Sequence, residues 1–169
     1  MYLKKMTAPV LGLAMGISCL GNNAGASTSI NTSFQVKIAI AATCIFSTGG
    51  ASDLDFGTQG VLTSNIDQTS TIMVQCTNTT PYNIGLNGGS VANSVSGRQM
   101  KSAAGGLINY ALFQDSGHLT NWGNTVGTDT LSAIATGSAV THTVYGRVTP
   151  QATPAPGAYA DTVTVTVTY

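Results

Sequence analysis

Residues 29–40 read Ser-Ile-Asn-Thr-Ser-Phe-Gln-Val-Lys-Ile-Ala-Ile, so that a β-branched or large apolar residue stands at every second position. The end of the chain has the same pattern, because residues 162–169 read Thr-Val-Thr-Val-Thr-Val-Thr-Tyr. Strict alternation with a period of two is typical of a β-strand with one buried face, and β-branched side chains suit that surface. Residues 29–40 and residues 162–169 are therefore each predicted to form a strand.

Shorter segments between these two ends also favour strands. They are residues 71–77, 82–86, 108–114 and 141–148. Clusters of turn-forming residues separate them, at positions 47–52, 87–90, 102–106 and 154–157. The best helical periodicity, over residues 131–140, is interrupted by Gly137. Roughly seven short strands without a linker predict one all-β domain, an immunoglobulin-like antiparallel β-sandwich.

The composition excludes several classes of protein. The chain has 169 residues, of which 43% are hydrophobic and only 7% charged, with 6 Lys and Arg against 6 Asp and no Glu. A nucleic-acid-binding protein needs a basic surface, and a helical bundle needs Glu and Lys on its exposed faces. Disorder usually combines low hydrophobicity with a high net charge. A globular chain with a nearly uncharged polar surface remains.

The first 26 residues are typical of a secretory signal peptide. Lys4 and Lys5 precede an apolar run over residues 8–20, and Ala24-Gly25-Ala26 provides a cleavage site after Ala26. The run is too short to span a bilayer, which needs about 20 apolar residues. The alternative is a lipoprotein signal acylated at Cys19, but Gly16 stands where such signals usually have Leu. We therefore expect an exported protein.

Cleavage would leave two cysteines, Cys44 and Cys76. An even pair in an exported chain predicts a disulfide, which would contribute about 3.5–4 kcal/mol through the entropy of the unfolded chain.

Loss of Lys4 and Lys5 on cleavage would leave 6 − 2 = 4 basic against 6 acidic residues, a net charge near −2. This charge is too small to indicate a charged partner.

The alternating N-terminal segment must pair with something, because an unpaired apolar strand promotes aggregation. It could pair within its own sandwich, or it could add a strand to another subunit. Composition and periodicity do not choose between these two possibilities.

A series of motifs resembles the spore coat protein U domain family, in order and spacing, from about residue 34 to residue 169. The motifs are Phe34-Gln35-Val36-Lys37-Ile38, Leu54-Asp55-Phe56-Gly57, Ile84-Gly85-Leu86-Asn87-Gly88-Gly89, Arg98-Gln99-Met100, Ile108-Asn109-Tyr110-Ala111-Leu112-Phe113, Trp122-Gly123, Val144-Tyr145-Gly146-Arg147-Val148 and Pro156-Gly157-Ala158-Tyr159-Ala160-Asp161-Thr162. This family is similar to the pilins of archaic, Csu-type chaperone–usher fimbriae.

The resemblance implies a sandwich that lacks its last strand and is completed by a donor strand from a neighbouring subunit. Its implied partners are a periplasmic pilus chaperone, an outer-membrane usher and other pilin subunits in a head-to-tail polymer. The implied route is export through the periplasm to a surface fimbria that supports adhesion and biofilm formation. The implied divisions are a signal peptide over residues 1–26, a donor segment over 27–40 and a pilin domain over 41–169.

The resemblance also assigns roles to particular residues. The candidate donor side chains are Ile30, Thr32, Phe34, Val36 and Ile38. Cys44 and Cys76 match the disulfide positions of the family, and Tyr169 stands where such pilins meet the basic cleft of their chaperone.

Enzymatic and other binding functions have weaker support. His118 and His142 are the only histidines, and although Asp115 lies near His118 in the sequence, no G-x-S-x-G motif is present. We expect both histidines to be exposed, and we expect no catalytic residue, cofactor or metal. Asp53 and Asp55 could contact calcium, but the EF-hand pattern is absent. One competing hypothesis is a secreted hydrolase. The other is a self-complemented coat or carbohydrate-binding protein with Trp122 in a sugar-contacting loop. A lone Trp is more often part of a core, which favours that role for Trp122.

Overall fold

The structure is a computed structural model that describes residues 27–169. Residues 39–169 form one compact unit, and residues 27–38 belong to a separate one. The predicted signal peptide and Cys19 lie outside the described residues. Residues 27–169 contain no helix that is long and apolar enough to cross a membrane.

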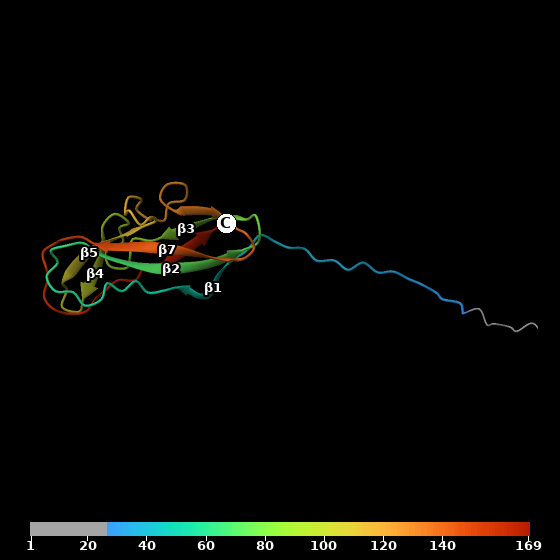
Figure 1. Cartoon of the computed structure of the whole chain (residues 1–169), viewed down its shortest axis with the longest axis horizontal. Coiled ribbons are helices and arrows are strands. Elements are labelled where there is room, and N and C mark those ends of the chain that lie inside the picture. The colour runs from blue at the N-terminus through green and yellow to red at the C-terminus, as the bar shows by residue number, and fades with distance from the viewer. Residues whose placement is uncertain (1–26) are drawn as a thin grey trace, which may run out of the picture. The chain divides into compact units, whose positions relative to one another are not determined.

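The compact unit is built from nine β-strands (Figure 1). They are β1 (Cys44–Ala51), β2 (Ile66–Cys76), β3 (Pro81–Leu86), β4 (Arg98–Ser102), β5 (Leu107–Phe113), β6 (Leu131–Ile134), β7 (Ala139–Val148), β8 (Tyr159–Ala160) and β9 (Val165–Thr168). The described residues contain no helix.

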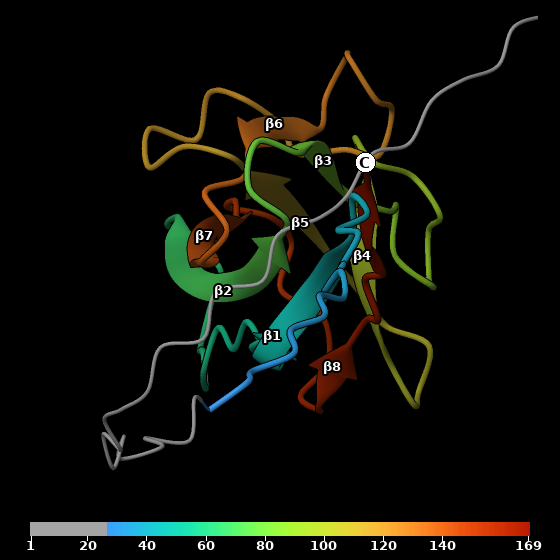
Figure 2. The same ribbon diagram turned by 90° about the vertical axis from the view of Figure 1, so that its right-hand side faces the viewer.

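The strands form two antiparallel sheets. One has six strands in the order β1-β2-β7-β5-β4-β8, and the other has three in the order β6-β3-β9. The longest pairing joins β2 and β7 from Ile66↔Val148 to Gln75↔Ala139. Figure 2 shows the curved β2 and β7 on one side and β3 with β6 on the other. The predicted all-β sandwich is confirmed.

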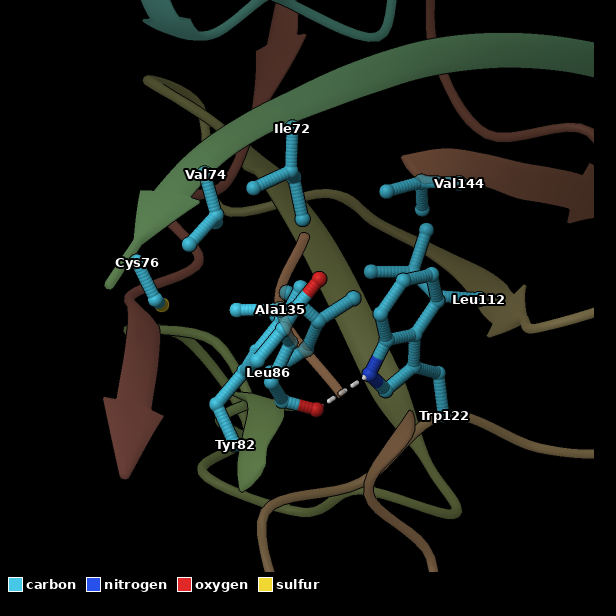
Figure 3. Close-up of a cluster of buried hydrophobic side chains, with 10 residues drawn as sticks. Ile72, Val74, Cys76, Tyr82, Leu86, Leu112, Trp122, Ala135 and Val144 are labelled. Atoms are coloured by element: carbon cyan, nitrogen blue, oxygen red, sulfur yellow. Dashed lines mark hydrogen bonds between the residues drawn. The ribbon is translucent and has the colours of Figure 1, made fainter. Parts of the chain in front are cut away.

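The core lies between the two sheets and follows the alternation of their strands. Ile72 and Val74 of β2 face Ile84 and Leu86 of β3, and each of these side chains is at most 1% exposed. Trp122 is fully buried among them, and its indole N–H donates to the carbonyl of Ile84 at 2.8 Å (Figure 3). The indole is thus a core side chain, as expected of a lone Trp, and cannot serve as a sugar-contacting surface.

Arg98 at the start of β4 is fully buried, which the sequence reasoning did not predict. Its guanidinium donates to the carbonyl oxygens of Leu86, Asn87, Val95 and Trp122 at 2.7–3.1 Å. Burial lowers the pKa of Arg98. The charge is tolerated because four carbonyl oxygens accept its hydrogen bonds.

The strands of the compact unit differ from the sequence prediction at several places, and the two-residue strand β8 was not predicted. Residues 47–52 were expected to be a turn but mostly belong to β1, where Gly49 and Gly50 have positive φ and the register with β2 shifts between Phe46 and Ala51. These glycines allow a bulge instead of a chain reversal. Residues 131–134 form β6 in place of any helix, and β4 was missed because its first inward residue is polar.

The predicted disulfide between Cys44 and Cys76 is confirmed. The two cysteines are also Cα partners at the start of the β1–β2 ladder. The bond therefore fastens β1 to β2, the strand that makes the long pairing with β7.

Candidate functional site

Two strands leave one edge of the sandwich open. β1 is the end strand of the larger sheet and pairs only with β2, while β9 is the end strand of the smaller sheet and pairs only with β3. Figure 2 shows β1 and, in red below the C-terminus, β9. An end strand presents a row of unpaired N–H and C=O groups that can accept another strand.

A groove of about 520 Å³ lies between the chain segments next to these two strands. One wall is residues 51–56, directly after β1, and the other is residues 159–165, which lead through β8 into β9. The floor consists of Ile72, Leu86, Leu112 and Val144, which are also members of the hydrophobic core. The groove therefore lies directly over the hydrophobic core, and its four floor side chains are at most 5% exposed.

The first wall alternates between partly buried and exposed side chains. Leu54 lies so close to Gly146 of β7 that a Cβ on this glycine would meet the Leu54 Cδ1 atom at 2.6 Å, and Phe56 lies beside the same position. Asp53, which precedes Leu54, and Asp55, which lies between Leu54 and Phe56, are exposed. The Asp55 carboxylate accepts a hydrogen bond from the backbone N–H of Gly57 at 2.8 Å. The wall thus turns apolar side chains inward and carboxylates to the rim.

The second wall is fastened by Asp161. Its carboxylate accepts hydrogen bonds from the Ser90 backbone N–H and hydroxyl, both at 2.8 Å, and from the Tyr110 hydroxyl at 2.7 Å. Burial raises the pKa of Asp161, but the hydrogen bonds from Tyr110, Ser90 and nearby backbone groups outweigh this and hold the pKa below its ordinary value. Burial, and then the hydrogen bond to Asp161, raises the pKa of Tyr110. The network holds the wall in position without a metal or a disulfide.

β9 completes this wall with an uncharged surface. Val165 and Val167 are partly buried against the core, whereas Thr166 and Thr168 are exposed. Tyr169 follows the strand and is 60% exposed.

The predicted donor side chains lie in residues 27–38, which form no strand. Ile30 is 95% exposed, and Phe34, Val36 and Ile38 are 86–87% exposed. Thr32 is exposed as well. The strand predicted over residues 29–40 is therefore not formed in the single chain, because a strand needs the hydrogen-bonding groups of a neighbour. We refer to residues 27–38 as the arm.

The histidines are not placed as a catalytic pair, and neither is as exposed as the sequence suggested. The side chain of His118 is only 8% exposed and lies against the ring of Phe113, with its Nε2 atom 3.7 Å from Asp67. His142 Nε2 is 2.9 Å from the Tyr82 hydroxyl across the two sheets, and burial lowers the pKa of His142.

Asp115 is engaged by the backbone of its own loop and not by a histidine side chain. Its carboxylate accepts hydrogen bonds from the N–H groups of Leu119 and Thr120. Within residues 27–169 there is also no group of three or more His, Cys, Asp or Glu side chains suited to a metal ion. The arrangement of walls, floor and open edges is suited to binding an extended chain.

Comparison with known proteins agrees with this arrangement. The Spore Coat Protein U domain family model matches residues 30–166, which confirms the resemblance found in the motifs. No curated protein sequence matches the chain.

Two solved structures are similar to the chain. One is the CsuC–CsuE chaperone–tip adhesion subunit pre-assembly complex from archaic chaperone–usher Csu pili of Acinetobacter baumannii, with 25% identity, a TM-score of 0.53 and coverage of 77% of this chain. The chain spans 40% of that protein. The other is a chaperone–tip adhesin complex of CFA/I fimbriae biogenesis, with 11% identity, a TM-score of 0.48 and coverage of 75% of this chain and 42% of that one.

Proposed function

The chain belongs to the spore coat protein U domain family, and from this premise we propose that it is a structural subunit of a surface fimbria assembled by donor-strand exchange. In this proposal the groove of each subunit receives the arm of the next one. The subunit has no catalytic role. Its surface location supports adhesion and biofilm formation.

The observation that carries the proposal is the apolar groove between the segment that leaves β1 and the segment that leads into β9. Ile72, Leu86, Leu112 and Val144 pack inside the sandwich and at the same time form the floor of the groove. An inserted strand would bury its own apolar side chains against this floor and could form hydrogen bonds with the free edges on both sides. Burial of each large apolar side chain contributes about 1.5–3 kcal/mol, so several of them stabilise the junction strongly.

The arm has the features that such an inserted strand needs. Four large apolar side chains at alternate or near-alternate positions, from Ile30 to Ile38, are exposed in the single chain. In an extended conformation alternate side chains face the same way, so Phe34, Val36 and Ile38 would enter the groove together. Donation from each subunit to the next is a head-to-tail contact that does not close, and it generates an open filament.

The proposal includes the path to the surface. Residues 1–26 act as a cleaved signal peptide, residues 27–40 as the donor segment and residues 41–169 as the pilin domain. A periplasmic chaperone protects the groove and contacts Tyr169 at the end of β9, and an outer-membrane usher replaces it with the arm of another subunit. The similarity to a chaperone-bound Csu subunit supports these partners.

The test compares two substitutions at neighbouring positions of the arm. The chain is expressed with the chaperone and usher of an archaic pilus system, and polymers are detected as ladders that resist SDS and collapse on boiling. Phe34→Lys would place a charge in the apolar groove and abolish the ladder. The matched variant Gln35→Lys places the same charge on the opposite face and should assemble like the unchanged chain. A stable monomer in place of a ladder from the unchanged chain would contradict the proposal and favour self-complementation.

A further inference from the structure

Most charged side chains of the compact unit are engaged within it. Arg98 is buried against carbonyl oxygens, and Arg147 donates to the Asp67 carboxylate at 2.6 and 2.7 Å. Asp161 fastens the second wall, and Asp129 accepts a hydrogen bond from the Thr125 N–H at 2.7 Å. In a chain with only 7% charged residues, the few charged side chains of residues 27–169 that are exposed and form no ion pair are informative.

Two of these remaining charges lie at the rim of the groove. Asp53 and Asp55 line the first wall and are exposed, and neither forms an ion pair within residues 27–169. They are two positions apart and on the same face, so their negative charges add along the rim. The opposite wall offers no cation, because the exposed residues of β9 are Thr166 and Thr168.

The arm carries one charge, and it has the opposite sign. Lys37 is the only charged residue from position 27 to position 52, and its side chain is exposed. Because it stands between Val36 and Ile38, Lys37 faces outward whenever these two residues face the groove. The other unpaired cation, Lys101 of β4, is exposed beside Met100, and it is Met100 that lines the groove.

We propose that Lys37 of one copy pairs with the Asp53–Asp55 rim of a second copy and thereby limits the register in which the arm is inserted. This inference rests on the proposed donor-strand exchange. The apolar positions of the arm repeat every two residues, so a shift by two would still present apolar side chains to much of the groove. A single outward lysine favours the registers that bring it beside Asp53 or Asp55 over registers shifted further along the groove, because opposite charges on adjacent strands attract.

The experiment measures the rate of polymer growth from the full chain in the same chaperone–usher system. Lys37→Glu should slow growth by roughly three- to tenfold, because it places three carboxylates together. Asp53→Lys or Asp55→Asn, combined with Lys37→Glu, should restore most of the rate. Asn at position 55 can still accept the Gly57 hydrogen bond, so the rim keeps its shape. Growth of the unchanged chain should also slow as salt is raised, while Lys37→Gln should be less sensitive to salt.

The controls separate this inference from the proposed function. Emission from Trp122, the single tryptophan, shows whether each variant is folded. If Phe34→Lys blocks growth but Lys37→Glu grows at the unchanged rate, the register role of Lys37 is wrong and strand exchange stands. The same conclusion follows if Lys37→Glu slows growth and neither rim variant restores it. If Phe34→Lys grows normally as well, strand exchange itself is wrong.

Discussion

The arm and β9 have the same alternation of apolar and polar residues but different structures. Val165 and Val167 of β9 lie against the core, and the strand pairs with β3 from Asn83↔Thr168 to Leu86↔Val165. Phe34 and Val36 of the arm are more than four-fifths exposed, and no strand forms there. The sequence pattern is sufficient for β9 because β3 provides an edge. The arm has the same pattern but pairs with no edge within residues 27–169 of its own chain, and the proposed strand exchange gives it the edges of a second molecule.

Removal of the arm should have the largest effect. A chain without residues 27–38 should form no polymer at all, because no donor is left to fill the next groove. Electron microscopy of the secreted material would show whether filaments are present. The truncated chain should nevertheless bind a synthetic peptide of residues 29–40, which should raise the guanidinium concentration at which the chain unfolds, as followed by Trp122 emission. Unfolding of the truncated chain in the presence of saturating peptide would show instead that the arm belongs to its own sandwich.

Loss of the disulfide should have the next largest effect, because it loosens β1, one of the two edges offered to the arm. The cysteines are 32 positions apart in the sequence, and replacing both Cys44 and Cys76 by Ser should lower the free energy of unfolding by about 3.5–4 kcal/mol. The loss of unfolding free energy is measured by guanidinium unfolding of the peptide-bound truncated chain, with Trp122 emission as the signal. A loss below about 1 kcal/mol would show that the strand ladder alone holds β1.

The opposite wall should depend on Asp161. Replacement by Asn removes the charged acceptor for Ser90 and Tyr110 and should cost about 1.5–3 kcal/mol in the same unfolding assay. Since the folded-state pKa of Asp161 lies below 3.8, its stabilisation is complete above that pH and is lost as the pH falls further. The Asn variant should therefore lose less stability than the unchanged chain on acidification below pH 3.8.

The smallest expected effect concerns His142, which joins the two sheets through Tyr82 away from the groove. Burial lowers the pKa of His142 below 6.5, so the unfolded chain takes up a proton first as the pH falls. Stability should be complete above pH 6.5 and decline below it, until the folded form also binds the proton. The variant His142→Gln should lack this decline between pH 7.5 and 5.5 in guanidinium unfolding. An equal decline in both chains would assign the pH dependence to another group.

The sequence predicted the sandwich and the disulfide but not the shape of the groove. Alternation in β2, β3, β7 and β9 is visible because one face of each is apolar, and the cysteine pair is visible because exported chains oxidise their thiols. The groove escapes prediction because Ile72 and Leu112 look like ordinary core residues until the strand order is known. Arg98 escapes because only the fold brings four carbonyls to its guanidinium. The arm was predicted as a strand, but the sequence could not say whose edge it would use.

Amide hydrogen exchange over residues 30–38 tests the account most directly, because donor-strand exchange must convert these backbone groups from solvated to hydrogen-bonded. In the assembled filament we predict strong protection of this segment, comparable with that of β2 and β7, and rapid exchange of the same residues in the chaperone-bound subunit. Rapid exchange of residues 30–38 in a filament whose β2 and β7 are protected would contradict the account, since the subunits would then be joined by some other surface.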